Sequence, residues 1–216
     1  MNKKVADIRK DYLFDESKNL LENEILPDPL KQFEIWFNDA LRKDGMEANA
    51  MFLATSTKKC IPSVRTVLLK GFDEQGFVFF TNYSSRKGNE LEENPNASIL
   101  FFWKELGRQI RIEGIIEKIS GEESDEYFHS RPVDSQIAAA ASAQSNVIEN
   151  REVLDHKFNE LKGKYKDGII PRPANWGGYR LAPHKIEFWQ GRQNRLHDRI
   201  LYSKNDEGWG IQRLAP

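Results

Sequence analysis

Four positively chargeable side chains crowd one short segment near the end of the chain, GRQNRLHDRI: Arg192, Arg195, His197 and Arg199. On a β-strand, the last three of them would share one face, and Trp189 of the preceding EFWQG would lie on the same parity. Like charges on one face repel each other unless an anion or a polar ligand lies among them. The spacing therefore favours a ligand site with a flat aromatic wall. The alternative is a charged edge strand that blocks aggregation.

A second pair of cations lies at the start of a predicted helix, in TNYSSRKGNE. Arg86 and Lys87 fall in its first turn, where cations oppose the helix dipole at a cost of about 0.3–1 kcal/mol each. A bound phosphate would reverse this effect, because the free N–H groups of a helix N-terminus add to the same positive field. The alternative is that both side chains extend into water.

Two further cations flank the apolar run of SVRTVLLKGF. Arg65 and Lys70 are five residues apart, so on a regular strand they point to opposite faces of the sheet. This spacing predicts that each serves a different site. The alternative is that one or both are strand-end charges whose long side chains reach solvent.

The segment YFHSRPVDSQ combines groups that bind phosphate. Tyr127 and Arg131 are four residues apart and share one helical face. Pro132 can begin a new helix, which leaves Arg131 near its N-cap and Ser135 in its first turn. Two hydroxyls, a guanidinium and a helix N-terminus would then converge. The alternative is that Asp134 satisfies the helix end and pairs with Arg131.

The elements that must position these groups are mostly strands. Alternating or β-rich apolar runs predict strands at 50–57, 61–72, 76–82, 97–103, 108–119, 179–183, 184–191, 199–204 and 208–214. Helical patterns lie at 26–45, 84–95, 122–130, 133–145 and 148–166. Strands before and after a helical block predict an α+β, mainly β fold: an antiparallel barrel with peripheral helices.

The first helix has clear ends. Asp28 can cap it, Pro29 suits its first position, and Gly45 can end it. Its expected apolar stripe is Leu30, Phe33, Phe37, Ala40 and Leu41. The small-residue helix AAAASAQS carries Gln144 and Ser145 at its end, and its composition favours close helix packing.

Composition excludes several classes of protein. The 216 residues include 32 basic and 33 acidic side chains, a net charge of -1, which argues against a general nucleic-acid binder. The single cysteine, Cys60, allows no internal disulfide and fits a reducing compartment. We expect a cytoplasmic protein, because no apolar run suggests a signal peptide or a membrane span. The four histidines lack metal-ligand spacing, so no metal is expected.

Three separated motifs resemble the pyridoxine/pyridoxamine 5'-phosphate oxidase family: RTVLLKGFDEQGFVFFTNYSSRKGNELEENP, YFHSRPVDSQI, and IEFWQGRQNRLHDR with the terminal RLAP. The resemblance runs from about Ile8 to Pro216. It implies an FMN-binding split barrel over residues 27–216, including a helical insertion at 121–166, after a mobile N-terminal segment at 1–26. It further implies a homodimer, with FMN at the subunit interface. The implied reaction oxidises pyridoxamine or pyridoxine 5'-phosphate to pyridoxal 5'-phosphate, with O2 as acceptor and H2O2 as product.

The resemblance also implies which residues contact FMN. Arg65 and Lys87 resemble ligands of its phosphate, and Arg86 lies beside them. The implied set is Arg65, Thr66, Val67, Leu68, Leu69, Lys70, Phe80, Thr81, Arg86, Lys87, Gln109, Gln144, Ser145, Trp189 and Arg199. Family members supply some of these contacts from the second subunit, at positions matching Gln144, Ser145, Trp189 and Arg199.

The substrate contacts follow from the same resemblance. The substrate phosphate is expected on Lys70, Tyr127, Arg131 and Ser135. Arg195 and His197 are the expected catalytic residues, over the pyridine ring and its C4' substituent. Arg9 and Tyr12, in IRKDY, resemble an N-terminal segment that folds over the bound substrate.

Some positions depart from the family pattern. Phe80 stands where tyrosine is common, and IAAAASAQS is poor in bulky residues. Arg192 and Gln193 replace smaller or acidic residues, which bears on the charge at the pocket mouth. The alternative function is a flavin- or haem-binding split-barrel protein without oxidase activity. Such a protein would not need YFHSRPVDS or RLHDR, and both are present.

Overall fold

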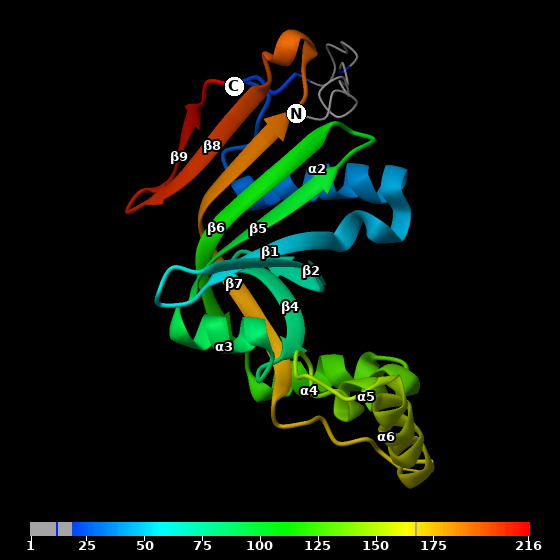
Figure 1. Ribbon diagram of the computed structural model, residues 1–216. Coiled ribbons are helices and arrows are strands. Elements are labelled where there is room, and N and C mark those ends of the chain that lie inside the picture. Colours follow the sequence, from blue (N-terminus) through cyan, green and yellow to red (C-terminus); the bar gives the residue numbers. More distant parts are fainter. Residues whose placement is uncertain (1–11, 13–18, 167) are drawn as a thin grey trace, which may run out of the picture. The chain divides into compact units, whose positions relative to one another are not determined.

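The computed structural model describes Tyr12, residues 19–166 and residues 168–216 (Figure 1). The predicted N-terminal segment therefore lies largely outside the described residues, and Arg9 lies outside them altogether. The described helices are α2 (Pro29–Asp44), α3 (Arg86–Glu93), α4 (Gly121–Ser130), α5 (Val133–Ala141) and α6 (Arg151–Lys164), with 3-10 turns η2 (Gly45–Asn49) and η3 (Gln193–Arg195). Among these helices, none is long and apolar enough to cross a membrane.

The strands of the described part form one sheet. They are β1 (Ala50–Ser56), β2 (Pro62–Leu68), β3 (Gly71–Asp73), β4 (Gly76–Asn82), β5 (Asn96–Trp103), β6 (Arg108–Lys118), β7 (Trp176–Gln190), β8 (Asp198–Asn205) and β9 (Gly208–Arg213). The sheet order is β2-β1-β5-β6-β7-β4-β3, with β8 on β7 and β9 on β8. The pairs β3–β4, β4–β7, β7–β8 and β8–β9 are antiparallel.

The prediction of two separate strands around Pro183 was wrong, because β7 is a single strand of 15 residues. Its residues 176–181 pair with β4 and its residues 185–190 pair with β8. Pro183 lies between these two paired stretches, where neither β4 nor β8 needs the N–H that proline lacks. The proline therefore marks a change of partner along one strand.

The chain divides into two compact units. The first comprises residues 1–52, 98–113 and 183–216, and the second comprises 53–97 and 114–182.

In the first unit, α2 begins and ends where the sequence predicts. The Asp28 carboxylate accepts a hydrogen bond from the backbone N–H of Leu30 at 2.8 Å, and Gly45 follows the helix with φ +60°. The expected apolar stripe was wrong in one respect, because Trp36 is buried whereas Leu41 is 43% exposed. The i, i+3, i+4 spacing continues from Phe33 through Trp36 and leaves Leu41 on the outer side.

Aromatic side chains fill the core beneath this helix. The Phe33 ring lies 5.3 Å from the Phe101 ring, and Trp36 packs edge-on against Phe188 at 5.2 Å. Phe33, Phe101 and Phe188 are fully buried. This packing fixes α2 on the strands of its unit.

In the second unit, α4, α5 and α6 gather around a core of Phe128, Ile137, Ile170 and Trp176 (Figure 1). The predicted helix at 133–145 was too long, because α5 ends at Ala141. Ser142 has an extended backbone, with ψ 117°, and Ser145 has φ +73°, so neither residue continues the helix. Gln144 and Ser145 therefore lie in a loop.

The start of α3 is held against the chain that precedes it. Ser85 caps the helix by accepting from the N–H of Gly88, and a Cβ at Gly88 would lie 2.0 Å from the carbonyl oxygen of Tyr83. Only glycine allows this close approach without a backbone shift. The contact determines where the first turn of α3, with Arg86 and Lys87, lies.

We expect Gly88→Ala to destabilise the protein by about 1–3 kcal/mol, because the added methyl group overpacks against backbone. Thermal unfolding would show a lower Tm. Gly163→Ala in α6 is the matched control: its Cβ would meet nothing within 4 Å, and alanine is the better helix former. A Gly88→Ala protein that melts at or above the wild-type temperature would contradict the packing argument.

Candidate functional site

The second unit contains a pocket of about 620 Å³, within the size range of small-molecule sites. Residues from β2, β4, α3, α4, α5 and β7 line it. Those predicted from the sequence are Arg65, Thr66, Val67, Leu68, Lys70, Phe80, Thr81, Lys87, Tyr127, Arg131, Ser135 and Gln144. Two groups of cations, predicted from separate motifs, thus share one pocket.

The expectation that Arg65 and Lys70 lie on opposite faces of a strand was wrong. Strand β2 ends at Leu68, so the two-residue period does not extend to Lys70, and both side chains line the same pocket. Leu69 between them is buried and is not a lining residue. The break between β2 and β3 thus lets two nearby cations serve one pocket.

Lys87 is a buried cation with neutral partners. Its Nζ donates to Thr81 Oγ1 at 3.0 Å, to Gln144 Oε1 at 2.9 Å and to Ser85 Oγ at 3.4 Å. The residue is only 8% exposed, so the alternative that its side chain extends into water was wrong for Lys87. None of its hydrogen-bond partners in the described part of the chain carries a negative charge.

Burial lowers the pKa of Lys87 to about 8, and the nearby Arg65 adds to this effect while Glu90 opposes it. An ammonium in these surroundings gains from any anion that enters the pocket. Its position in the first turn of α3 adds the field of the helix N-terminus.

Arg86, the other cation of that turn, has different surroundings. Its side chain is 64% exposed, and its Nε donates to Glu90 Oε1 at 2.8 Å. It is not among the residues that line the pocket. Arg86 and Lys87 therefore differ in both burial and position: Lys87 lines the pocket and Arg86 does not.

Arg131 lies between two helices, as the C-cap of α4 and directly before Pro132, the N-cap of α5. Its guanidinium carbon is 4.8 Å from the centre of the Trp176 ring. Its Nη1 is buried without a hydrogen-bond partner among the residues that the structure describes. Burial lowers the pKa of Arg131, while Tyr127 opposes the shift. A buried unpaired donor is costly, and an oxyanion in the pocket would satisfy it.

The alternative proposed for this segment, an ion pair between Asp134 and Arg131, was wrong. Asp134 accepts from Lys162 Nζ at 2.8 Å instead. Tyr127, Arg131 and Ser135 all line the pocket, as their spacing predicts.

Three aromatic rings form a wall of this pocket. The Phe80 and Tyr127 rings stack at 3.8 Å with an angle of 18°, and the Phe80 and Trp176 rings stack at 5.5 Å with an angle of 15°. Phe80, where tyrosine was the expected residue, keeps this stacking without a hydroxyl.

Several lining residues were not predicted from the sequence: Asn82, Pro132, Ala138, Ala139, Ser142 and Trp176. Trp176 lies in DGIIPRPANWGG, whose proline and glycine content is typical of a loop, although it is the first residue of β7. The two glycines that follow it are a usable signal. A Cβ at Gly177 would lie 2.2 Å from the Tyr83 hydroxyl oxygen, so small residues are needed beside the tryptophan.

Other predicted residues belong to the first unit. Tyr12, Trp189 and His197 form an aromatic cluster there: the Trp189 and His197 rings are 4.6 Å apart, and Tyr12 lies 5.6 Å from Trp189 and 5.8 Å from His197. The backbone N–H of Arg192 donates to His197 Nδ1 at 3.0 Å. In neutral His197 the proton is therefore on Nε2. Burial, and secondly Arg195, lowers the pKa of His197, while Asp198 opposes the shift.

The shared strand face predicted for Arg195, His197 and Arg199 was wrong. Asn194 and Arg195 have positive φ angles in η3, and only Arg199 lies within β8. Arg199 Nε donates to Glu187 Oε1 at 2.8 Å, so the positive charge of Arg199 is paired with a carboxylate. The alternative of an edge strand was wrong too, because β8 pairs with both β7 and β9.

The remaining predicted residues are not brought to the pocket. Gln109 lies half-buried in β6 of the first unit, and Ser145 is exposed. Gln144, by contrast, lines the pocket and contacts Lys87 of its own chain. That a second subunit supplies some of the contacts to FMN stays a prediction.

An antiparallel sheet that presents two cation clusters and an aromatic wall to one pocket defines a class: a β-structured protein whose site fits phosphorylated small molecules. Comparison with known proteins narrows this class. Residues 37–165 match the family profile described as "Pyridoxamine 5'-phosphate oxidase". Residues 176–216 match the profile described as "Pyridoxine 5'-phosphate oxidase C-terminal dimerisation region".

Individual relatives agree. A pyridoxine/pyridoxamine 5'-phosphate oxidase from a Nostoc species is 55% identical over the full length of both chains. The chloroplastic enzyme of that name from Arabidopsis thaliana is 51% identical over 98% of this chain and 40% of its own length. The crystal structure of PhzG from Burkholderia lata, in complex with tetrahydrophenazine-1-carboxylic acid, superposes with a TM-score of 0.86 at 33% identity, covering 95% of this chain and 98% of that one.

The chain belongs to the pyridoxine/pyridoxamine 5'-phosphate oxidase family, and it is an oxidoreductase that carries the family's C-terminal dimerisation region. The family resemblance and the mainly antiparallel split-barrel fold with peripheral helices, both predicted from the sequence, are confirmed.

The protonation of Lys87 predicts a pH dependence of ligand binding. Without ligand, Lys87 is charged below about pH 8 and loses its proton above it. A phosphate stabilises the charged form, so the affinity for FMN, the phosphorylated cofactor that the sequence resemblance implies, should fall by about tenfold from about pH 7 to about pH 9. Fluorescence titration of the flavin-free protein measures this. Riboflavin, which lacks the phosphate, is the control and should show no such slope. An equal slope in Lys87→Met would assign the effect to another group.

Proposed function

We propose that this protein oxidises pyridoxamine 5'-phosphate and pyridoxine 5'-phosphate to pyridoxal 5'-phosphate, with FMN as cofactor and O2 as electron acceptor, producing H2O2. One observation carries the proposal: two separate cation clusters, around Lys87 and around Arg131, line a single pocket. Two clusters suit two phosphorylated ligands, a nucleotide cofactor and a phosphate ester. Family membership supports the same pairing.

The residues present fit FMN. Lys87 supplies a buried positive charge whose hydrogen-bond partners among the described residues are neutral, and Arg65 lies on the same pocket. These two residues would hold the FMN phosphate, with Thr81 and Gln144 orienting the Lys87 ammonium. When bound, the isoalloxazine ring would accept the electrons removed from the substrate and pass them to O2.

The second cluster fits the phosphate of the substrate. Arg131 Nη1 is a buried donor with no partner among the described residues, and Tyr127, Ser135 and Lys70 line the pocket with it. Trp176 holds the Arg131 guanidinium in place from one side. A phosphate anchored there restricts the orientation of the rest of the substrate, which lowers the entropic cost of reaction.

The residues of the first unit complete the proposal. We infer that Arg195 and His197 act on the substrate at its C4' substituent, and that Tyr12 belongs to a segment covering it. Gln109, Trp189 and Arg199, and also Ser145 of the second unit, remain proposed FMN contacts. The dimerisation region supports a homodimer, with FMN proposed at the subunit interface. A cytoplasmic location also remains a prediction.

The decisive experiment is anaerobic reduction. The purified protein should be yellow, and pyridoxamine 5'-phosphate should bleach it without O2. Admitting O2 should restore the colour and generate H2O2, measured with a peroxidase-coupled dye. A yellow protein that never bleaches would be the non-catalytic flavin binder, and a colourless protein without flavin affinity would disprove the FMN assignment.

The two phosphate sites should separate on mutation. Arg131→Met keeps an apolar stem against Trp176 but removes the charge, so KM for pyridoxamine 5'-phosphate should rise about tenfold or more, as charged hydrogen bonds contribute about 1.5–3 kcal/mol. The Kd of FMN should stay within about twofold, because the Lys87 cluster is unchanged. Steady-state kinetics and flavin titration provide the two values. Equal losses of both would show that the sites are misassigned.

A further inference from the structure

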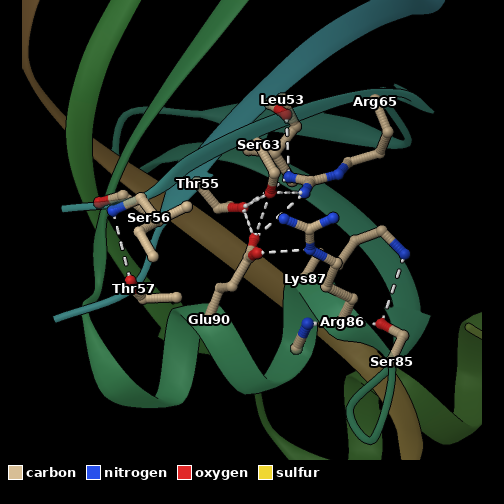
Figure 2. A network of polar contacts seen from close by, with 12 residues as sticks. Leu53, Thr55, Ser56, Thr57, Ser63, Arg65, Ser85, Arg86, Lys87 and Glu90 are labelled. Atoms are coloured by element: carbon tan, nitrogen blue, oxygen red, sulfur yellow. Dashed lines mark hydrogen bonds and ion pairs between the residues drawn. The ribbon is translucent and has the colours of Figure 1, made fainter. Parts of the chain in front are cut away.

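Glu90 is a buried carboxylate at the side of the phosphate-binding cations, and neither motif nor resemblance singled it out. It lies on α3, one turn after Arg86, and its side chain is 5% exposed. Figure 2 shows its carboxylate pointing toward Thr55 of β1 and toward Ser63 and Arg65 of β2. A buried acid beside a proposed anion site needs an explanation, since it repels the ligand that the site is built to hold.

Four donors converge on this carboxylate. Oε2 accepts from the hydroxyl of Thr55, from Ser63 Oγ at 2.5 Å and from Arg65 Nη2 at 3.2 Å, while Oε1 accepts from Arg86 Nε at 2.8 Å. Burial alone would raise the pKa of Glu90, but the hydrogen bonds from Ser63, Thr55 and Arg86 outweigh it and lower the pKa to about 2. Glu90 is therefore ionised at neutral pH.

The network fixes the guanidinium of Arg65. Its Nη1 donates to the Leu53 carbonyl at 3.0 Å and to Thr55 Oγ1 at 2.6 Å, and its Nη2 donates to Ser63 and Glu90. The terminal N–H groups are thus used by protein acceptors. The hydrogen bonds of Arg65 to the described residues use only Nη1 and Nη2, which leaves the Nε–H for a ligand, and Arg65 lines the pocket.

We propose that Glu90 is a positioning residue for the phosphate of FMN: it holds the Arg65 and Arg86 guanidiniums in one arrangement and does not itself touch the cofactor. The proposal rests on the proposed function, because it assumes that the Lys87 cluster receives FMN. In this arrangement Lys87 supplies an ammonium that is hydrogen-bonded to neutral groups only, and Arg65 supplies a donor of fixed direction. No hydrogen bond joins Glu90 to Lys87 in the described structure.

Two effects of removing the charge oppose each other. Glu90→Gln abolishes the repulsion between the carboxylate and a phosphate, which favours binding. It also places an amide NH2 where four donors converge, so at least one donor loses its acceptor. A carboxylate already paired with two guanidiniums repels a phosphate weakly, whereas a released arginine loses its defined direction. The second effect should dominate.

The experiment compares two flavins on the flavin-free full-length protein. Fluorescence quenching gives the Kd of FMN and of riboflavin for wild type and Glu90→Gln. The Kd of FMN should rise about tenfold, since bonds to charged groups are the strong ones, while the Kd of riboflavin should change less than about twofold. Glu93→Gln is the matched control: it removes the same charge from the same helix, at an exposed side chain outside the network, and both Kd values should stay near those of wild type.

Each other result decides against the proposal. Tighter FMN binding in Glu90→Gln would show that repulsion dominates, and equal weakening of both flavins would show a purely structural role. An unchanged Kd of FMN would show that Glu90 has no role in FMN binding. If Glu90→Gln does not fold, Ser63→Ala tests the same network with the charge retained, and FMN alone should weaken by a smaller factor. A wild-type protein that fails to bind FMN would overturn the proposed function as well, whereas the outcomes above leave that function standing.

Discussion

The site depends on keeping positive charge inside the protein without cancelling it. Burial lowers the pKa of both Lys87 and Arg131. Lys87 is nevertheless held by hydroxyl and amide oxygens, and Arg131 by aromatic rings, where carboxylates would have been the more stabilising partners. Such groups orient a cation without neutralising its charge. A bound anion then offsets the free-energy cost of burying the cation, and this gain adds to the affinity for the anion.

The scaffold serves this constraint at specific contacts. Gly88 lets α3 approach the backbone of Tyr83 closely, which places Lys87 at the pocket. The end of β2 at Leu68 brings Lys70 to the same pocket as Arg65. Carboxylates are present, but they hold cations at the sides: Glu90 pairs with Arg65 and Arg86, and Asp134 pairs with Lys162. Lys87 and Arg131 thus have no carboxylate hydrogen-bonded to them among the described residues, whereas Arg65 has an acid partner and also lines the pocket.

Local features were predictable because they depend on neighbours in the sequence. The caps of α2, the place of Arg86 and Lys87 in the first turn of α3, and the start of α5 after Pro132 were all predicted from residue type and spacing. Predictions that assumed regular strand geometry for residues outside a strand were wrong. Arg195 and Asn194 have positive φ, and the segment from Arg195 to Arg199 therefore has no common face.

The sequence by itself determined the family, the mainly antiparallel fold and the groups able to bind phosphate, because these follow from motifs and from local periodicity. Only the tertiary structure decided which groups meet. Trp176 and Glu90 act through neighbours far away in the chain. Arg86 and Lys87 are adjacent cations of one helical turn, yet the first is largely exposed and the second is buried. Burial and the choice of partner are properties of packing between distant segments, and no pattern along the chain encodes them residue by residue.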